Sequence, residues 1–381
     1  MKRIYLDHGA TTPIAKEVLE EMKFYFNKKF GNASSLHSFG REAKEVLEKS
    51  REKILKKVNG TRHRLIFTSG GTESNNFAIK GVAFANKNKG KHIITTKIEH
   101  SCILKSCEWL KEQGFEITYL NVNSEGFIDL EELERKIRKD TILVSIIHAN
   151  NEIGTIQKIK EIGKICRENG VLFHTDACQS FTKVPINIEK NYVDLLTINS
   201  HKIYGPKGVG GLVIKEDIKI TPLLHGGGHE FWLRAGTENI HGIVGFAKAT
   251  EIIKEKHIEH MKKLRDGLIK RILEIEDTRL NGPKENRLCN NANFSFKYIE
   301  GESLVLSLDE KGIAASTGSA CSSHELKPSH VLLAIGLSPE EAHGSLRLTL
   351  GIDNTEEEIE YTIKVIRDCV EKLRKISPLR K

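Results

Sequence analysis

Residues 193–208 decide the fold, and they read Val193-Asp194-Leu195-Leu196-Thr197-Ile198-Asn199-Ser200-His201-Lys202-Ile203-Tyr204-Gly205-Pro206-Lys207-Gly208. The apolar run is typical of a buried strand, and the glycine-rich segment after Lys202 is typical of a turn. A lysine at the end of such a strand is crowded and loses its charge readily. A neutral amine forms Schiff bases, which makes Lys202 a candidate for covalent attachment of a carbonyl compound.

Short apolar runs alternate with helical patterns on both sides of this stretch, from about residue 60 to residue 215. Strands are expected at residues 65–68, 92–96, 116–120, 141–147, 171–175, 193–198 and 210–214. Helices are expected at residues 73–85, 101–113, 130–138 and 159–168, the second with Ser101 as its N-cap. The alternation predicts an α/β domain with a mostly parallel sheet. Ligands of such sheets bind at the carboxyl ends of the strands, where polar side chains gather in this sequence: His100, Asn150, Asn151, Asp176, Ser200, His201 and Lys202.

The pattern changes near Asn239. One long helical stretch is expected to extend to about Glu274, and mixed strand and helix patterns follow it. The N-terminal turn at residues 7–13 is expected to join this second region. We therefore predict a large domain of residues 15–256 and a smaller α+β domain formed by residues 1–14 together with residues 257–381.

Composition excludes several classes of protein. The chain carries a net charge of +8, but its basic residues are scattered among acidic ones, which indicates a solvated surface rather than a nucleic-acid groove. The mild excess can still assist docking of an acidic partner protein. No stretch approaches the roughly 20 apolar residues of a membrane span, and the N-terminus lacks an apolar signal core, so we expect a cytoplasmic protein. Seven widely spaced cysteines without a Cys-x-x-Cys pair argue against disulfides and structural zinc.

Lys202, Asp176 and the turn at residues 69–72 provide the three contacts that pyridoxal phosphate needs, which are an amine, a carboxylate and a phosphate site. The turn at residues 69–72 enters a helix and suits a phosphate group, or it is simply a tight turn with Thr72 as a cap. Asp176 needs a cationic partner, which is either a protonated pyridine nitrogen or a neighbouring arginine. Gln179 can donate to a phenolic oxygen. His100 can stack on a flat ring or shuttle protons, although a lone histidine is more often structural.

Three further positions are candidates for the chemistry. Cys321 lies in a small, polar and flexible stretch, where an exposed thiol is costly unless it is used, and His324 can help to ionise it. Arg347 lies between apolar residues and suits a carboxylate, or it pairs with an acid such as Asp353. The loop at residues 225–237 can supply Thr237 to a phosphate. Its two histidines lack a third ligand at the spacing of a metal site.

Together these segments resemble the cysteine desulfurases of the NifS/IscS type, which are pyridoxal-phosphate enzymes of the class-V aminotransferase group. The resemblance spans essentially the whole chain. The motifs that carry it are SGGTES, HANNEIGTIQ, HTDACQS, SHKIYGPKG, RAGTEN and STGSACSS, in that order. The resemblance implies pyridoxal-phosphate fold type I, with a seven-stranded sheet in the large domain and a mobile catalytic-cysteine loop in the small one.

The resemblance also implies a role for each candidate residue. Lys202 would bind the cofactor covalently, Asp176 would pair with its ring nitrogen, and His100 would stack on the ring and serve in acid–base steps. The phosphate would be held by Gly71, Thr72, Ser200 and His201, joined by Thr237 from the other subunit of a homodimer. Gln179 would contact the phenolic oxygen, and Asn151, which is also a cofactor contact, would bind the substrate carboxylate together with Arg347. Cys321 would be the nucleophile.

The implied reaction converts L-cysteine to L-alanine and leaves the sulfur as a persulfide on Cys321. The acceptor would be an iron–sulfur scaffold protein or a sulfurtransferase, for cluster assembly, other thio-cofactors or tRNA thiolation. Cys321 is also a possible transient ligand of an iron–sulfur cluster shared with a scaffold. The alternatives are a selenocysteine lyase, an aminotransferase, or a non-catalytic sulfur carrier.

This sequence departs from the family pattern at three places. Phe231-Trp232 replaces a smaller pair, Asn199 replaces a common serine, and the chain ends soon after Leu379.

Overall fold

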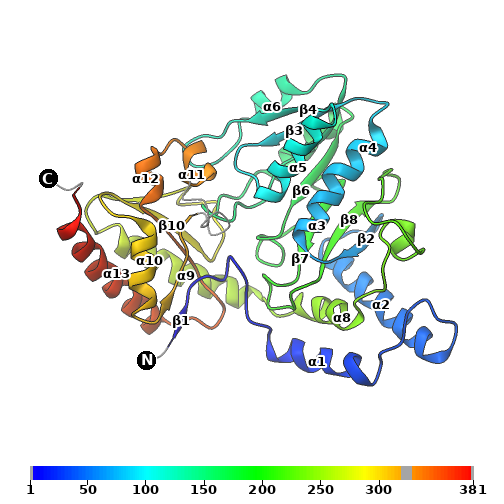
Figure 1. Ribbon diagram of the computed structural model, residues 1–381, viewed down its shortest axis with the longest axis horizontal. Helices are drawn as coiled ribbons and strands as arrows, with labels where there is room; N and C mark the ends of the chain where they lie inside the picture. The colour runs from blue at the N-terminus through cyan, green and yellow to red at the C-terminus, as the bar shows by residue number, and fades with distance from the viewer. Residues whose placement is uncertain (1–2, 319–327, 379–381) are drawn as a thin grey trace.

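A seven-stranded sheet forms the centre of the larger part of the molecule (Figure 1). The computed structural model describes residues 3–318 and 328–378. The strands lie in the order β2 (His63–Thr68), β8 (Gly210–Lys215), β7 (Leu195–Asn199), β6 (Leu172–Asp176), β5 (Thr141–Ser145), β3 (His92–Thr96) and β4 (Glu116–Leu120). Neighbours are parallel except that β8 is antiparallel to both β2 and β7. The predicted mostly parallel sheet is therefore confirmed.

Helices cover both faces of this sheet. One face packs on α1 (Lys16–Asn27), α2 (Ser38–Lys57), α6 (Leu130–Lys136), α7 (Ile159–Glu168) and α8 (Ile240–Ala249). The other face packs on α5 (Ser101–Glu112) and on a continuous helical run made of α3 (Gly71–Asn76), a π-helical turn (Phe77–Gly81) and α4 (Val82–Asn86). Leu65 and Phe67 belong to the apolar core on the first face, and Ile66 belongs to the core on the other face, as expected from the alternation of side chains along β2.

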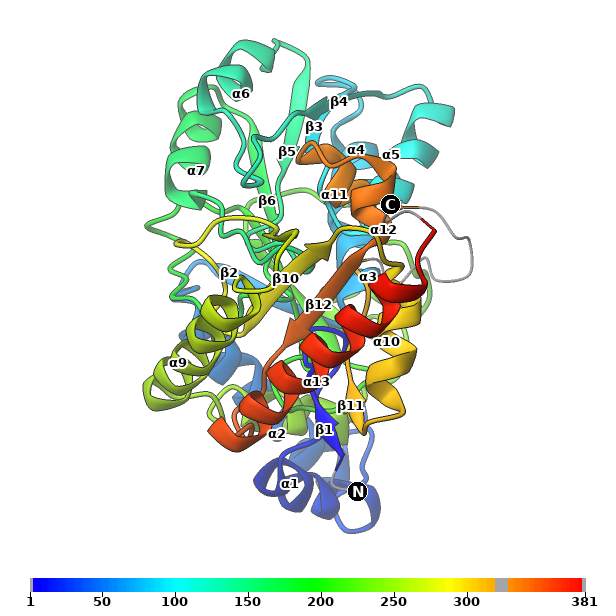
Figure 2. The ribbon, with the colours of Figure 1, turned by 90° about the vertical axis from the view of Figure 1, so that its left-hand side faces the viewer.

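A second, smaller assembly contains the C-terminal third of the chain (Figure 2). Its antiparallel sheet has the order β12 (Ser345–Thr349), β10 (Asn291–Phe296) and β9 (Thr278–Leu280). The helices α9 (Glu255–Ile272), α10 (Gly301–Asp309) and α13 (Glu356–Ile376) share one apolar core with this sheet. Two short helices, α11 (His330–Ala334) and α12 (Pro339–His343), lie beside it.

The N-terminal segment returns to the smaller assembly, because β1 (Ile4–Tyr5) pairs in parallel with β11 (Ile313–Ala314). Leu6 belongs to the same apolar core as the small sheet. The domain limits 15–256 and 1–14 with 257–381 stay a prediction. None of the described helices is long and apolar enough to cross a bilayer.

Two expectations about helices were wrong. The long helix expected from Asn239 to Glu274 is divided into α8, which ends at Ala249, and α9, which begins at Glu255 after the backbone N–H of Lys254 is satisfied by the His257 ring. The expected N-cap of α5 is not Ser101 but His100, whose side chain accepts the backbone N–H of Cys102 at 3.2 Å. A candidate site residue therefore also starts a helix.

A buried ion pair anchors the loop that carries Phe231-Trp232. The Glu230 carboxylate contacts the guanidinium of Arg51 at 2.8 and 3.0 Å and accepts the backbone N–H of Phe67 at 2.7 Å. Glu230, Phe231 and Trp232 have φ angles of 45°, 61° and 64°, a left-handed conformation that costs about 1 kcal/mol or more for each such residue. The Phe231 ring lies 4.8 Å from the Arg51 guanidinium, while Trp232 is 76% exposed. The ion pair holds this strained turn in place.

Replacing Glu230 by alanine should lower the free energy of unfolding by about 3 kcal/mol, because Arg51 would keep a buried charge without its main partner. Urea unfolding measures this loss. The matched control is Glu48→Ala, which removes the half-exposed second partner of Arg51 and should cost less than about 1 kcal/mol. Equal losses from both variants would contradict the assignment.

Candidate active site

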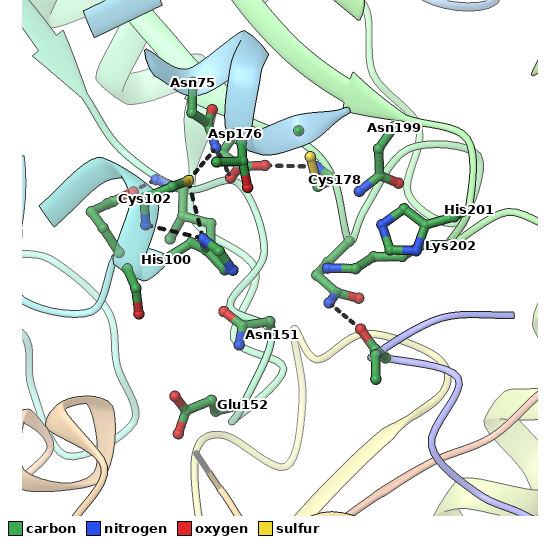
Figure 3. Close-up of a pocket in the computed structure, with 18 of the residues that line it drawn as sticks. Asn75, His100, Cys102, Asn151, Glu152, Asp176, Cys178, Asn199, His201 and Lys202 are labelled. Atoms are coloured by element: carbon green, nitrogen blue, oxygen red, sulfur yellow. Dashed lines mark hydrogen bonds between the residues drawn. The ribbon is translucent and has the colours of Figure 1, made fainter. Parts of the chain in front are cut away.

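A cavity of about 420 Å³ opens at the carboxyl edge of the large sheet, next to the small assembly. Because β8 is antiparallel to both its neighbours, β2 points the same way as β7, and the C-terminal ends of six strands, all except β8, lie at this edge. Figure 3 shows side chains from these strand ends and the loops after them turned toward one space. Nine of the predicted site residues line it: Gly71, Thr72, His100, Asn151, Asp176, Gln179, His201, Lys202 and Arg347.

Two of the described predicted site residues, Ser200 and Thr237, do not line this cavity. Cys321 lies outside the described residues, as does His324. Thr237 is exposed on the loop anchored by Glu230. Ser200 is buried. Its hydroxyl packs so closely against Gly205 that a Cβ at that position would lie only 2.0 Å from it. Asn199 lines the cavity instead, which favours Asn199 over Ser200 as the residue that reaches a ligand.

Asp176 is a buried carboxylate with neutral hydrogen-bond donors. It ends β6, is 4% exposed, and accepts the Asn75 amide at 2.6 Å and the backbone N–H of Cys178 at 2.8 Å. No residue of the described ranges forms an ion pair with it, so the neighbouring arginine considered from the sequence is not there. A buried carboxylate is stabilised by a cation, and the protonated ring nitrogen of pyridoxal phosphate meets that need. The site fits the cofactor in this respect.

Lys202 extends into the cavity from the turn after β7 (Figure 3). Its backbone is held firmly, because its carbonyl accepts the buried Lys183 amine at 3.1 Å. The same amine donates to the carbonyl of Gln179 at 3.0 Å, and burial lowers the pKa of Lys183 to about 8. Among the described residues, no hydrogen bond ends on the Lys202 amine, which leaves it available to a ligand.

The turn after β2 offers space for a phosphate. Gly70 has a φ of 155°, and a Cβ at Gly71 would meet the sulfur of Cys178 at 2.6 Å, so residue 71 must be glycine for the helix to begin this close to β6. Gly71 and Thr72 line the cavity at the first turn of α3, where backbone N–H groups are unpaired within the helix. His201 lies nearby, with a pKa lowered to about 4 by burial and by the charge of Lys202.

Arg347 reaches the cavity from β12 of the small sheet. Its guanidinium donates to Asp7 at 3.0 Å and to the carbonyl of Asn151 at 3.2 Å, so its acidic partner is Asp7 rather than Asp353. Its Nε atom is buried without a partner. An arginine held at the cavity wall beside Asn151 can receive a carboxylate.

Several lining residues were missed by the sequence analysis, among them Glu99, Glu152, Cys102 and Asn75. Burial raises the pKa of Glu99 to about 8, of Glu152 to about 7 and of Cys102 to about 12. Asn75 bridges Asp176 and Cys102 by its amide. Glu99 and Cys102 flank His100 in the sequence, and Glu152 follows Asn151, so adjacency to predicted residues was the available signal. Within residues 3–318 and 328–378, no group of His, Cys, Asp or Glu side chains is arranged to hold a metal ion.

Comparison with known proteins agrees with this geometry. The family model "Aminotransferase class-V" matches residues 4–362. The cysteine desulfurase IscS of Dictyoglomus turgidum (strain DSM 6724 / Z-1310) is 55% identical, covering 99% of this chain and 97% of that relative. The chain is a cysteine desulfurase of the class-V aminotransferase family. The IscS of Methanosarcina thermophila is 52% identical over 99% of this desulfurase and 94% of that relative.

Solved structures show the same relationship. A structure described as a NifS-like protein superposes with a TM-score of 0.91 at 40% identity, covering 97% of this desulfurase and all of that chain. Another, described as SspA in complex with cysteine, has a TM-score of 0.82 at 37% identity and covers 91% and 98% of the two chains. The fold is thus that of the pyridoxal-phosphate enzymes of fold type I, and pyridoxal phosphate is the cofactor of this enzyme family.

Asp176→Asn should weaken binding of pyridoxal phosphate by at least about tenfold, because a charge-assisted hydrogen bond of about 1.5–3 kcal/mol is lost. Titration of the apoprotein with the cofactor, followed by absorbance, measures this. Asp194→Asn is the matched control, because Asp194 is a largely buried aspartate that precedes β7 at the opposite edge of the sheet. Unchanged affinity in the Asp176 variant would show that this carboxylate does not bind the ring nitrogen.

Proposed function

We propose that this enzyme takes the sulfur atom from L-cysteine, releases L-alanine and carries the sulfur as a persulfide on Cys321. The observation that supports the proposal most is the convergence of Lys202, Asp176 and His100 on one cavity. The cysteine-bound structure of the 37% identical SspA supports L-cysteine as the substrate.

Each residue has a place in this reaction. Bound pyridoxal phosphate acts as an electron sink that activates the amino acid. Lys202 would hold the cofactor and move the proton at the substrate Cα, while Asp176 keeps the ring nitrogen protonated. His100 would donate or accept a proton from the cavity wall. Arg347 and Asn151 would receive the substrate carboxylate, and Gly71, Thr72, Asn199 and His201 would surround the phosphate, with Gln179 beside the ring.

The sulfur transfer step is balanced without an external oxidant. The C–S bond of cysteine breaks, an S–S bond forms with Cys321, and L-alanine leaves, so that L-cysteine and the Cys321 thiol give L-alanine and a Cys321 persulfide. A later acceptor takes the terminal sulfur. We propose an iron–sulfur scaffold protein or a sulfurtransferase as that acceptor, in line with the IscS relatives.

Cys321→Ala should retain cofactor binding and lose persulfide formation, lowering alanine release from cysteine by more than about a hundredfold because the attacking nucleophile is gone. Alanine and sulfide are measured in single-turnover and steady-state assays. Cys369→Ala is the control, since Cys369 belongs to the core of the small assembly around α13 and lies away from the cavity. A Cys321→Ala enzyme that releases sulfur at the normal rate would contradict the persulfide step.

We further propose that two copies of the chain form a homodimer. Large apolar side chains are exposed in and after α1 and at the start of α2: Phe24, Phe26, Phe30, Leu36 and Phe39. Such a cluster, here called the α1 aromatic patch, is typical of a protein interface. Thr237 is exposed and does not line the cavity of its own chain, which suits a contact to the partner's phosphate site.

Phe30→Glu should shift the protein from dimer to monomer, because it places a charge in the α1 aromatic patch. Sedimentation measures the mass, and a titration of the cofactor reports the lost contact of Thr237. Leu306→Glu is the control, because Leu306 is equally exposed but lies on α10, away from the patch. A Phe30→Glu protein that remains a full dimer would show that this patch is not the interface.

A further inference from the structure

The Asn75 amide has only one possible orientation. Asn75 is on α3, is 1% exposed, and its Nδ2 atom lies 2.6 Å from Oδ2 of Asp176. A carboxylate only accepts hydrogen bonds, so the amide nitrogen, and not its oxygen, must face Asp176. The second N–H of the same amide points to the sulfur of Cys102, at 3.2 Å (Figure 3).

Cys102 connects this amide to His100. The sulfur of Cys102 accepts from Asn75 and lies 3.0 Å from Nδ1 of His100. Burial raises the pKa of this thiol to about 12, so the thiol keeps its proton at neutral pH. With the Asn75 amide donating to the sulfur, the S–H proton is available to the His100 ring.

Two donors are therefore directed at one ring nitrogen. The backbone N–H of Cys102 lies 3.2 Å from Nδ1 of His100, and the S–H group approaches the same atom. A ring nitrogen that accepts hydrogen bonds carries no proton, so in the neutral ring the proton is on Nε2. Protonation of Nδ1 would break both hydrogen bonds.

We infer that Asn75 and Cys102 are positioning residues, which form a bridge from Asp176 to His100 and hold the His100 ring neutral with its proton on Nε2. This deepens the proposed function, on which it rests for the role of His100 in catalysis. Nε2 is then the nitrogen that exchanges a proton with a ligand in the cavity. The bridge links Asp176 and His100, the two predicted contacts of the cofactor ring, through neutral groups only.

Other charged groups also act on the His100 ring. Burial has the largest effect and lowers the pKa of His100. The charge of Lys202 lowers this pKa further, the charge of Asp176 raises it, and His330 lowers it. Glu99 precedes His100, and its backbone carbonyl contacts the ring of His330 at 2.9 Å. Cys102→Ala removes a neutral donor and leaves all of these groups in place, which makes it the decisive variant.

The test is a pH titration of the holoprotein with ¹⁵N-labelled histidine, in which side-chain nitrogen shifts report protonation and tautomer. His100→Gln identifies the resonance. In Cys102→Ala and in Asn75→Ala the pKa of His100 should rise by about half a unit, the size expected for one lost hydrogen bond. In the double variant the pKa of His100 should rise no further, because both changes break the same bridge. Cys102→Ser retains a donor and should restore the wild-type value.

Each variant has a neighbour of the same residue type as its control. Asn76→Ala changes an amide that contacts Ser106 and the carbonyl of Thr72, and Cys107→Ala changes a buried thiol of α5; neither residue lines the cavity. Both controls should leave the His100 pKa unchanged. If Asn75→Ala does not fold, Cys102→Ala and Cys102→Ser decide the question alone.

Two results would overturn the inference. One is a wild-type ring whose proton is on Nδ1, and the other is a Cys102→Ala protein with an unchanged pKa and Nδ1 shift. The Nδ1 shift reports the hydrogen bond even if the ring stays neutral throughout the titration. Because the titration needs no substrate, it is independent of the proposed function, which fails separately if the wild-type enzyme releases no alanine from cysteine.

Discussion

A carboxylate buried without a cation is the constraint on which this site depends. The effective cost of burying an unpaired ion is several kcal/mol, and two neutral donors at Asp176 offset only part of it. A protonated ring nitrogen would supply the missing charge, so that the protein and its cofactor would stabilise each other. The position is fixed by β6, which ends at Asp176 in the centre of the sheet, where the backbone is fully paired on both sides.

The sheet gathers the remaining residues around that carboxylate. Strand β8 is antiparallel to β2 and β7, which places the turn after β2, the predicted phosphate site, at the same edge as the ends of β3, β5, β6 and β7. The small assembly closes the other side, because β12 brings Arg347 next to the Asn151 backbone. Residues from opposite ends of the chain thus share one cavity, and the pairing of the N-terminal segment with β11 places Asp7 against Arg347.

Much of this arrangement could be predicted from local sequence. Continuous apolar runs such as β7 and the polar residues behind them predict both the sheet and the edge at which ligands bind. It was harder to predict which single residue faces the cavity, because Asn199 ends β7 and Ser200 follows it, and only the three-dimensional structure shows that Asn199 lines the cavity. The break between α8 and α9 falls at residues 250–254, within an otherwise helical sequence pattern.

Long-range pairs were beyond the sequence for a physical reason. Arg51 and Glu230 are 179 positions apart, and Asn75 and Asp176 are 101 positions apart, so nothing local signals their contact. Polar contacts of this kind are visible only in the folded structure, where distant segments of the chain come together. The family resemblance reached the residues that are predicted to contact the cofactor, but it did not reach Asn75 and Cys102, the neutral residues that we propose orient them.

The need to keep extra charge out of the cavity explains why Asn75 and Cys102, which we propose orient their neighbours, are neutral. An extra ion beside Asp176 would compete with the ring nitrogen or with Lys202 for its partner, whereas an amide and a thiol orient their neighbours without changing the net charge of the cavity. Glu99 follows the same rule, since burial raises its pKa to about 8 and so keeps that carboxyl largely protonated at neutral pH. The charge of the cavity is then left mainly to three lining side chains, Asp176, Lys202 and Arg347, each of which is predicted to contact the cofactor or the substrate.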